Sequence, residues 1–225
     1  VSAKDVILAI IKKLSVNGAT DKVIEFVGPV VEAFTMAARM TLCNMAVEAG
    51  ATCGICMPDQ VTAKYLWPFI EADYPSLEAA VEEYRGWHSD ADADYAAQLD
   101  FDVSALVPQV TFAYKPDQVK DIAEMAGTSI DQIYIGSCTN GRLSDFREVA
   151  KYLKGRHVAP GVKAIAVPGS QIVDVLCRNE GLDKVFTDAG FEWRGAGCSM
   201  CLAMNPDKLI GDQLCASSSN RNFKG

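Results

Sequence analysis

Histidine is nearly absent from this sequence of 225 residues, which contains only His88 and His157. A histidine cluster for catalysis or metal binding is therefore disfavoured. No apolar run reaches the roughly 18 residues that a membrane-spanning helix needs. Basic residues are also too few to balance the acidic ones: 21 Lys and Arg against 29 Asp and Glu give a net charge of −8 and a pI near 4.8. This balance argues against a nucleic acid or an anionic membrane as partner.

The composition is that of a soluble globular protein with a core, at 49% hydrophobic and 22% charged residues. No targeting segment is recognisable, because lysines and Asp5 interrupt the apolar residues of 1–14 at helical spacing. There are eight cysteines. A chain of this length and apolar content needs no disulfide framework, so we expect free thiols or metal ligands and a cytoplasmic location.

The first half predicts a mixture of helices and strands. Ser2 is the expected N-cap of a first helix, and a helix is expected over Val31–Glu48 with a break near Thr41. Asn44 and Glu48 lie four residues apart on this helix and therefore share one face of it. From the residues alone, we interpret that face as exposed to solvent. The remaining elements expected here are a strand over 22–27, a strand over 51–57 that contains Cys53 and Cys56, and helices over 61–70 and 77–84.

A change of composition follows, because residues 88–102 carry five aspartates and few large apolar side chains. We interpret them as a solvated connector between two α/β domains, 1–107 and 108–225. After the connector, strands alternate with helices, which predicts mostly parallel sheets in three-layer α/β/α domains. The elements expected are helices over 117–125, 144–153, 171–178 and 183–189 and strands over 132–135, 162–167 and 191–194.

Three cysteines lie in two glycine-flanked turns, 134–142 and 195–201. Cys138 follows a predicted strand, and ligands gather at the carboxyl ends of strands in parallel sheets. Three uses are compatible with the spacing. They are structural zinc bound by two Cys-x-x-Cys pairs (Cys53, Cys56, Cys198 and Cys201), a nucleophilic thiol at Cys138, and an iron–sulfur cluster bound by Cys138, Cys198 and Cys201. Spacing alone does not choose among them.

Three motifs, 136–140, 198–205 and 215–223, resemble the aconitase superfamily. The form Cys-Ser-Met-Cys-Leu-Ala-Met-Asn is similar to that of the large subunits of bacterial 3-isopropylmalate dehydratases. Residues 23–26 and 39–51 of the first half resemble the same subunits, so the resemblance covers essentially the whole chain. It also implies that the chain begins inside such a subunit, that the subunit's pattern would continue beyond Gly225, and that the chain is inactive by itself.

The resemblance implies a role for seven residues. Cys138, Cys198 and Cys201 match the ligands of a 4Fe–4S cluster with one iron free of protein ligands. The other matches are Asn44 and Asn220 beside the cluster, Glu48 close to the substrate oxygen, and Arg221 facing a substrate carboxylate. Asn44 and Glu48 are therefore expected to point into one site. Cys43, Cys53, Cys56, Cys177 and Cys215 are expected to be core or incidental thiols.

The implied activity is that of a hydro-lyase in leucine biosynthesis. It would interconvert 2- and 3-isopropylmalate by dehydration and rehydration, with the open iron acting as a Lewis acid toward a small 2-hydroxy dicarboxylic acid. The base would come from a small subunit that carries a swivelling domain. The alternatives are homoaconitase or another aconitase-type hydro-lyase and, from a different class, a non-catalytic metal-binding module.

Overall fold

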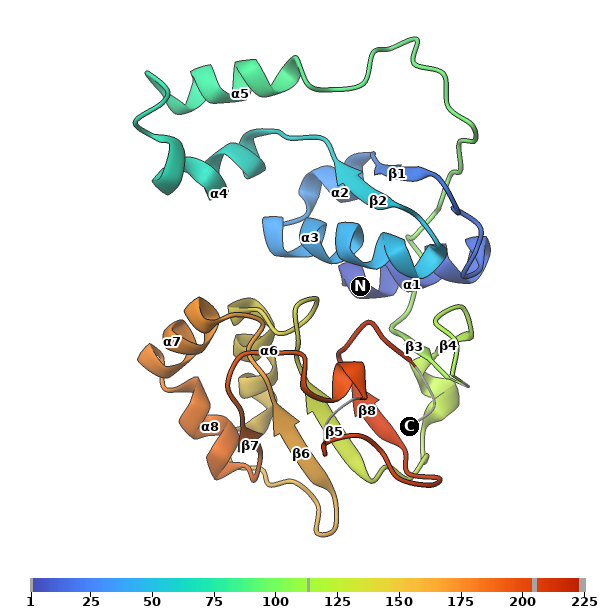
Figure 1. Ribbon diagram of the computed structural model, residues 1–225, viewed down its shortest axis with the longest axis vertical. Helices are drawn as coiled ribbons and strands as arrows, with labels where there is room; N and C mark the ends of the chain where they lie inside the picture. Colours follow the sequence, from blue (N-terminus) through green and yellow to red (C-terminus); the bar gives the residue numbers. More distant parts are fainter. Residues whose placement is uncertain (1, 113, 204–205, 223–225) are drawn as a thin grey trace. The chain divides into compact units, whose positions relative to one another are not determined.

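The protein divides into two compact units, Val1–Gln109 and Val110–Gly225 (Figure 1). The structure is a computed structural model that describes residues 2–112, 114–203 and 206–222. Met204 and Asn205 of the cysteine-pair motif and Phe223 of the last motif lie outside these described residues. Each unit is described by itself below.

The first unit pairs two short parallel strands and packs helices against them. Val23 is the register partner of Cys53, and Phe26 that of Cys56. Ser2 caps the first helix as expected, because its hydroxyl accepts the Asp5 N–H while its own N–H donates to the Asp5 carboxylate. The elements are α1 (Ala3–Leu14), β1 (Val23–Phe26), α2 (Pro29–Ala33), α3 (Met36–Met45), the 3₁₀ helix η1 (Ala46–Ala49), β2 (Cys53–Cys56), α4 (Gln60–Ile70) and α5 (Leu77–Arg85).

The helical segment expected over Val31–Glu48 is present as α2, α3 and η1, but its break lies at Phe34 and Thr35 and not near Thr41. Phe34 is extended, and Thr35 begins a new helix by accepting the Ala38 N–H on its hydroxyl at 3.3 Å. Thr35 is thus a second N-cap, a residue type that favours helix starts. Thr41, where a break was expected, lies inside α3 and donates its hydroxyl to Ala37 O at 3.2 Å.

The acidic segment after α5 packs back on the first unit. The hydroxyls of Ser89 and Tyr95 donate to the Glu25 carboxylate at 2.9 and 2.7 Å. Lys13 Nζ lies 5.9 Å from the centre of the Phe101 ring, within the range of a cation–π contact. Residues 88–102 are therefore part of the first unit, although they contain no described helix or strand.

The second unit contains a four-stranded parallel sheet in the order β7-β6-β5-β8. The helix expected over Asp117–Met125 is wrong: β4 and η2 occupy it, because extended Asp121 ends the strand and caps η2 through Glu124. The elements are β3 (Gln109–Thr111), β4 (Val119–Asp121), the 3₁₀ helix η2 (Ile122–Met125), β5 (Gln132–Ile135), α6 (Leu143–Leu153), β6 (Lys163–Ala166), α7 (Gln171–Asn179), α8 (Leu182–Asp188), β7 (Glu192–Trp193), the 3₁₀ helix η3 (Ser199–Leu202) and β8 (Cys215–Ser217).

The two faces of this sheet are covered differently. Side chains alternate along a strand, so Ile133 and Ile135 join the core formed by α6, α7 and α8, in which Phe146 and Phe186 are fully buried. Tyr134 points to the other face, where Met200 of η3 packs near it. Parallel sheets flanked by helices confirm the expected α/β class. On the second face, the segment that carries the paired cysteines covers the sheet.

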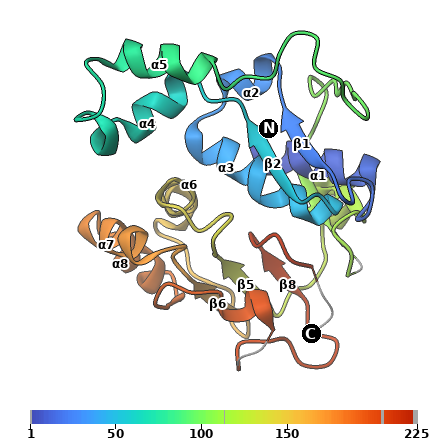
Figure 2. The same cartoon turned by 45° about the horizontal axis from the view of Figure 1, so that its top comes forward.

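Strand order fixes where loops meet. The chain passes from β5 to β6 to β7 in one direction, then returns to place β8 on the opposite side of β5 (Figure 1). Figure 2 shows β5 between β6 and β8. Such a reversal opens a crevice at the carboxyl ends of the two strands that flank it, the usual ligand position in open parallel sheets. Among the described residues, no helix has both the length and the apolar character to cross a membrane.

Candidate functional site

Three loops meet at the carboxyl edge of the second unit's sheet. Cys138 follows β5, the pair Cys198 and Cys201 follows β7, and Asn220 and Arg221 follow β8. Since β5, β6, β7 and β8 all run parallel, these loops leave the same edge. The topology therefore brings five of the seven predicted site residues to one edge.

The Cys138 loop is folded tightly against β6. A Cβ at Gly141 would lie 2.4 Å from Ser137 O and 2.9 Å from Val167 O, distances that no side chain allows. Gly141 O in turn accepts the Gly169 N–H at 2.8 Å. Glycine at position 141 thus permits the close approach that turns Cys138 outward, where it is exposed.

Residues after β8 hold the Cys138 loop from the other side. Ser218 Oγ accepts the Gly136 N–H at 3.0 Å and lies 3.1 Å from Asn140 O, so that it also donates within the loop. Thr139, which is buried, donates its hydroxyl to Asn220 Oδ1 at 3.1 Å. The predicted site residue Asn220 therefore has its amide oriented by a neighbour of Cys138.

The paired cysteines lie at either end of the first turn of η3. Ser199 has a left-handed φ of +48°, and Cys201 donates its N–H to Cys198 O at 3.0 Å. Below the turn, Tyr134 donates its hydroxyl to Cys198 O at 2.9 Å. From the loop after β8, Ser219 Oγ lies 3.1 Å from Cys201 Sγ and donates to it. Both cysteines are thus positioned by hydrogen bonds from β5 and from the loop that follows β8.

A buried carboxylate anchors the same turn. Asp207 accepts hydrogen bonds from Ser199 Oγ at 2.9 Å, from Lys163 Nζ at 3.2 Å and from Arg194 Nη2 at 3.1 Å. Burial raises the pKa of the Asp207 carboxyl, but the donors Ser199 and Lys163 and the charge of Arg194 outweigh it and hold the pKa below its ordinary value. Asp207 is therefore ionised at neutral pH and fixes the backbone between the two cysteines.

The Tyr134 hydroxyl lies at the cysteine turn, where it donates to Cys198 O. Burial raises its pKa well above the ordinary value, and charge on Cys201, Cys198 and Cys138 raises it further. A cavity of about 40 Å³ lies beside it, lined by Tyr134, Met200, Cys201, Ala203, Ser217, Ser219 and Arg221. Arg221 is exposed and borders the same cavity as Cys201.

The chemistry of the donor set fits an iron–sulfur cluster. Three thiols from two separate loops, with a hydroxyl that donates to one sulfur, are the ligand chemistry of such clusters. Across the part of the chain that the structure describes, no three His, Cys, Asp or Glu side chains converge closely enough to hold one ion. Separate corners of a cluster, in contrast, take thiolates that need not meet at one point.

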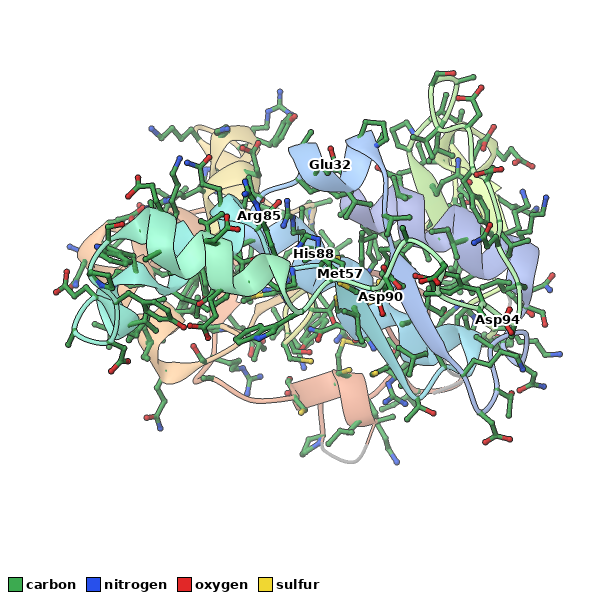
Figure 3. All side chains as sticks on the ribbon, turned by 90° about the horizontal axis from the view of Figure 1, so that it is seen from above. Glu32, Met57, Arg85, His88, Asp90 and Asp94 are labelled. Carbon is green, nitrogen blue, oxygen red and sulfur yellow. The ribbon has the colours of Figure 1, made fainter. Side chains whose placement is uncertain are left out.

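Within the described residues of the second unit, no hydrogen bond joins Cys138 to a histidine or a carboxylate. His88 is exposed, belongs to the first unit and lies near Met57, with its Nε2 2.6 Å from Pro58 O (Figure 3). His157 is exposed in the loop after α6. Cys138 Sγ has Thr139 Oγ1 at 3.9 Å, which is a hydroxyl and not a base at neutral pH.

Asn44 and Glu48 belong to the first unit. Asn44 is exposed in the last turn of α3, whereas Glu48 is half-buried in η1. Residues four apart share a face only on a continuous α-helix, and the helix changes to 3₁₀ geometry after Met45. Their participation in one site with the cysteines stays a prediction.

Several residues of this edge were missed by sequence reasoning, namely Tyr134, Thr139, Asp207, Ser218 and Ser219. A run of three serines before Asn220 was the only local signal for the last two. Asp207 gives no such signal, because its partners Lys163 and Arg194 come from distant parts of the chain.

The chain matches known proteins along its whole length. The model of the aconitase family (aconitate hydratase) matches residues 1–128 and 120–225. The chain is 57% identical over 225 residues to the 3-isopropylmalate dehydratase large subunit of Geobacter metallireducens, covering 100% of this chain and 53% of that protein. It is 46% identical over 260 residues to the protein of the same description from Akkermansia muciniphila, covering 100% and 55%. The chain thus spans about half the length of the curated relatives it matches. The family model matches this chain from residue 1 to residue 225, so the chain belongs to the aconitase family.

Proposed function

We propose that this chain is part of a hydro-lyase that interconverts 2-isopropylmalate and 3-isopropylmalate by dehydration and rehydration in leucine biosynthesis. The observation that carries the proposal is the common edge of β5, β7 and β8, at which Cys138, the pair Cys198 and Cys201, and Arg221 are all presented. Relatives described as 3-isopropylmalate dehydratase large subunits at 54–57% identity support it.

Cys138, Cys198 and Cys201 would hold a 4Fe–4S cluster as thiolates. When bound, such a cluster with one iron free of protein ligands supplies Lewis-acid chemistry to the substrate hydroxyl. The chain's own contribution is to position the thiolates. The Asp207 and Tyr134 hydrogen bonds hold the turn of Cys198, and Ser219 donates to Cys201.

Arg221 would bind a carboxylate of the substrate, because its planar guanidinium offers two parallel donors to two carboxylate oxygens. Asn220 would be a polar neighbour of the cluster, with its amide oriented by the hydroxyl of Thr139. Asn44 would play the same part from the first unit. Glu48 would transfer a proton to the departing hydroxyl.

The base that removes a proton from the neighbouring carbon would come from a partner. Large-subunit relatives imply a small subunit, and we assign the base to a swivelling domain on it. A cytoplasmic location belongs to the same proposal, because free cysteines persist in a reducing compartment.

The test is a set of measurements on the full-length protein combined with its small subunit. We expect about four iron and four sulfide per chain after reconstitution and turnover of 2-isopropylmalate. Cys138→Ser should lower turnover by roughly 100-fold or more. Cys53→Ser is the matched control, since Cys53 is exposed on the other unit and should leave iron content and turnover unchanged.

Other results would contradict the assignment in distinct ways. Faster turnover of homoaconitate or citrate than of 2-isopropylmalate would favour another aconitase-type hydro-lyase. One zinc per chain without sulfide would favour a non-catalytic module. Arg221→Lys distinguishes binding of the substrate from incorporation of the cluster. We expect full iron content with KM raised about 10-fold or more, because lysine keeps the charge but loses the two-donor fork.

A further inference from the structure

Two thiols outside the proposed cluster site lie next to each other in the first unit. Cys43 is in the last part of α3 and Cys56 ends β2, and their sulfur atoms are 3.8 Å apart. Figures 1 and 2 both draw β2 alongside α3. Both thiols are half-buried, so a small reagent has access to them. Neither is among the proposed cluster ligands.

A glycine brings the two elements together. A Cβ at Gly54 would lie 2.9 Å from Ala46 Cβ and 3.0 Å from Cys43 Cα, so only glycine lets β2 pack this closely on α3. Positions 54 and 56 face the helix, whereas Cys53 and Ile55 are exposed, as alternation along a strand requires. Cys56 is therefore the partner of Cys43 and not of Cys53, although Cys53 and Cys56 form the visible Cys-x-x-Cys pattern.

The two thiols differ in acidity. The hydrogen bond with Cys56 lowers the pKa of the Cys43 thiol to about 7. The same hydrogen bond, together with burial, raises the pKa of Cys56 above its ordinary value. The charged groups that face Cys56 are Arg39 on α3 and Asp59 at the start of α4, which are paired with each other at 2.7 Å. Two thiols in contact with unequal acidity are what the attacking and resolving cysteines of reactive dithiol sites require.

We propose that Cys43 and Cys56 form a thiol–disulfide exchange site whose substrate is a small disulfide such as oxidised glutathione. The Cys43 thiolate attacks one sulfur of the small disulfide, forming a mixed disulfide and releasing one small thiolate. Cys56 then loses its proton to solvent and attacks the Cys43 sulfur, forming the Cys43–Cys56 bond and releasing the second small thiolate. The protein dithiol is oxidised by two electrons, and the small disulfide is reduced to two thiols.

The movement required is small. A disulfide needs about 2.05 Å between sulfur atoms, so the two sulfurs must approach by less than about 2 Å, which side-chain rotation at two cysteines can provide. The exchange site also adjoins the proposed hydro-lyase site along the chain, because Asn44 follows Cys43 directly.

The experiment is oxidation of the full-length protein with oxidised glutathione at pH 7, followed by acid quenching, alkylation and peptide mass mapping. We expect a cross-linked pair of peptides that contain Cys43 and Cys56. Cys53→Ser is the control and should form the same cross-link. Cys56→Ser should accumulate glutathione on Cys43, because the resolving thiol is gone. Cys43→Ser should slow modification of Cys56 by about 10-fold or more, since the attacking thiolate is gone.

A second measurement tests the pairing in the reduced protein. The rate of Cys43 alkylation should rise with a midpoint near pH 7, and in Cys56→Ala, which has no hydrogen-bond donor at this position, the midpoint should move toward the ordinary thiol value of about 8.5. Faster modification of Cys53 than of Cys43, absence of the Cys43–Cys56 cross-link, or an unchanged midpoint in Cys56→Ala would overturn the proposal. None of these readouts depends on turnover, so they are independent of the proposed function.

Discussion

Ser219 Oγ donates to Cys201 Sγ at 3.1 Å, which connects the loop after β8 with the cysteine pair after β7. The two strands lie on opposite sides of β5 in the sheet order. A residue that sequence reasoning did not single out therefore contacts one of the three proposed ligands directly. Hydrogen bonds to ligand sulfur are among the features by which proteins set the reduction potential of an iron–sulfur cluster.

Ser219→Ala removes that donor, and we expect the reduction potential of the reconstituted cluster to fall. Negative charge on sulfur increases on reduction, so the lost hydrogen bond stabilised the reduced state more. A differential of about 1 kcal/mol corresponds to roughly 40 mV for one electron. Redox titration followed by electron paramagnetic resonance measures the shift. Ser219→Thr keeps the hydroxyl and should restore the potential; a potential unchanged in Ser219→Ala would contradict the assigned role of Ser219.

Gly141→Ala should disrupt the Cys138 loop. The added Cβ would lie 2.4 Å from Ser137 O, so the backbone must move. We expect about 1–3 kcal/mol of destabilisation, as for other overpacked sites, and reduced iron incorporation. Gly195→Ala is the matched control, because position 195 lies close to the cysteine pair in sequence but a Cβ added there would have no atom within 4 Å. Chemical unfolding and iron analysis of both variants provide the comparison; equal iron content would argue against the close-packed loop.

The helices α6, α7 and α8 and the strands β5 and β6 could be predicted from the sequence because their signals are local. The helix expected over 171–178, for example, is α7, and the Ser170 hydroxyl caps it by accepting the Val173 N–H. β5 was predicted over the residues it occupies, since its apolar side chains are bounded by turn residues.

The parts that could not be predicted depend on distant partners. β8 has three residues, and its strand conformation follows from its pairing with β5, where Gln132 is the partner of Cys215. The contact between Cys43 and Cys56 likewise depends on how β2 packs on α3. A Cys-x-x-Cys pattern suggests the wrong pair because alternation along a strand separates its two members.

Arg39 is predicted to be the main polar support of the first unit. It is 2% exposed, donates to both Asp59 carboxylate oxygens at 2.8 and 2.7 Å, and caps α2 through Val31 O and Glu32 O. Arg39→Met removes one donor from each of these acceptors and leaves the partly exposed Asp59 carboxylate without its ion pair, so we expect a loss of about 1–3 kcal/mol in the free energy of unfolding.

Arg85→Met serves as the comparison for Arg39. Its partner Glu82 is at 2.6 Å, but both side chains are largely exposed, at 67% and 72%. Exposed pairs contribute little, so a change below about 1 kcal/mol is expected. Chemical denaturation measures the free energy of unfolding of both variants. Equal losses would show that the contribution of Arg39 to stability does not depend on its burial.

The charge of Asp207 is expected to make the stability of the second unit depend on pH in the acid range. Its pKa is lowered in the folded state, because its donors Ser199 and Lys163 and the charge of Arg194 outweigh burial. A carboxyl whose folded pKa lies below its unfolded value of about 3.9 contributes stability above that value, and the contribution is lost as pH falls through the folded pKa. Asp207→Asn should therefore cost about 1–3 kcal/mol at pH 7 and progressively less below about pH 4. Unfolding curves between pH 3 and pH 7 test this, with Asp212→Asn, an exposed residue nearby, as control. A difference between Asp207→Asn and the parent that stays constant over this range would mean that Asp207 does not act through its charge.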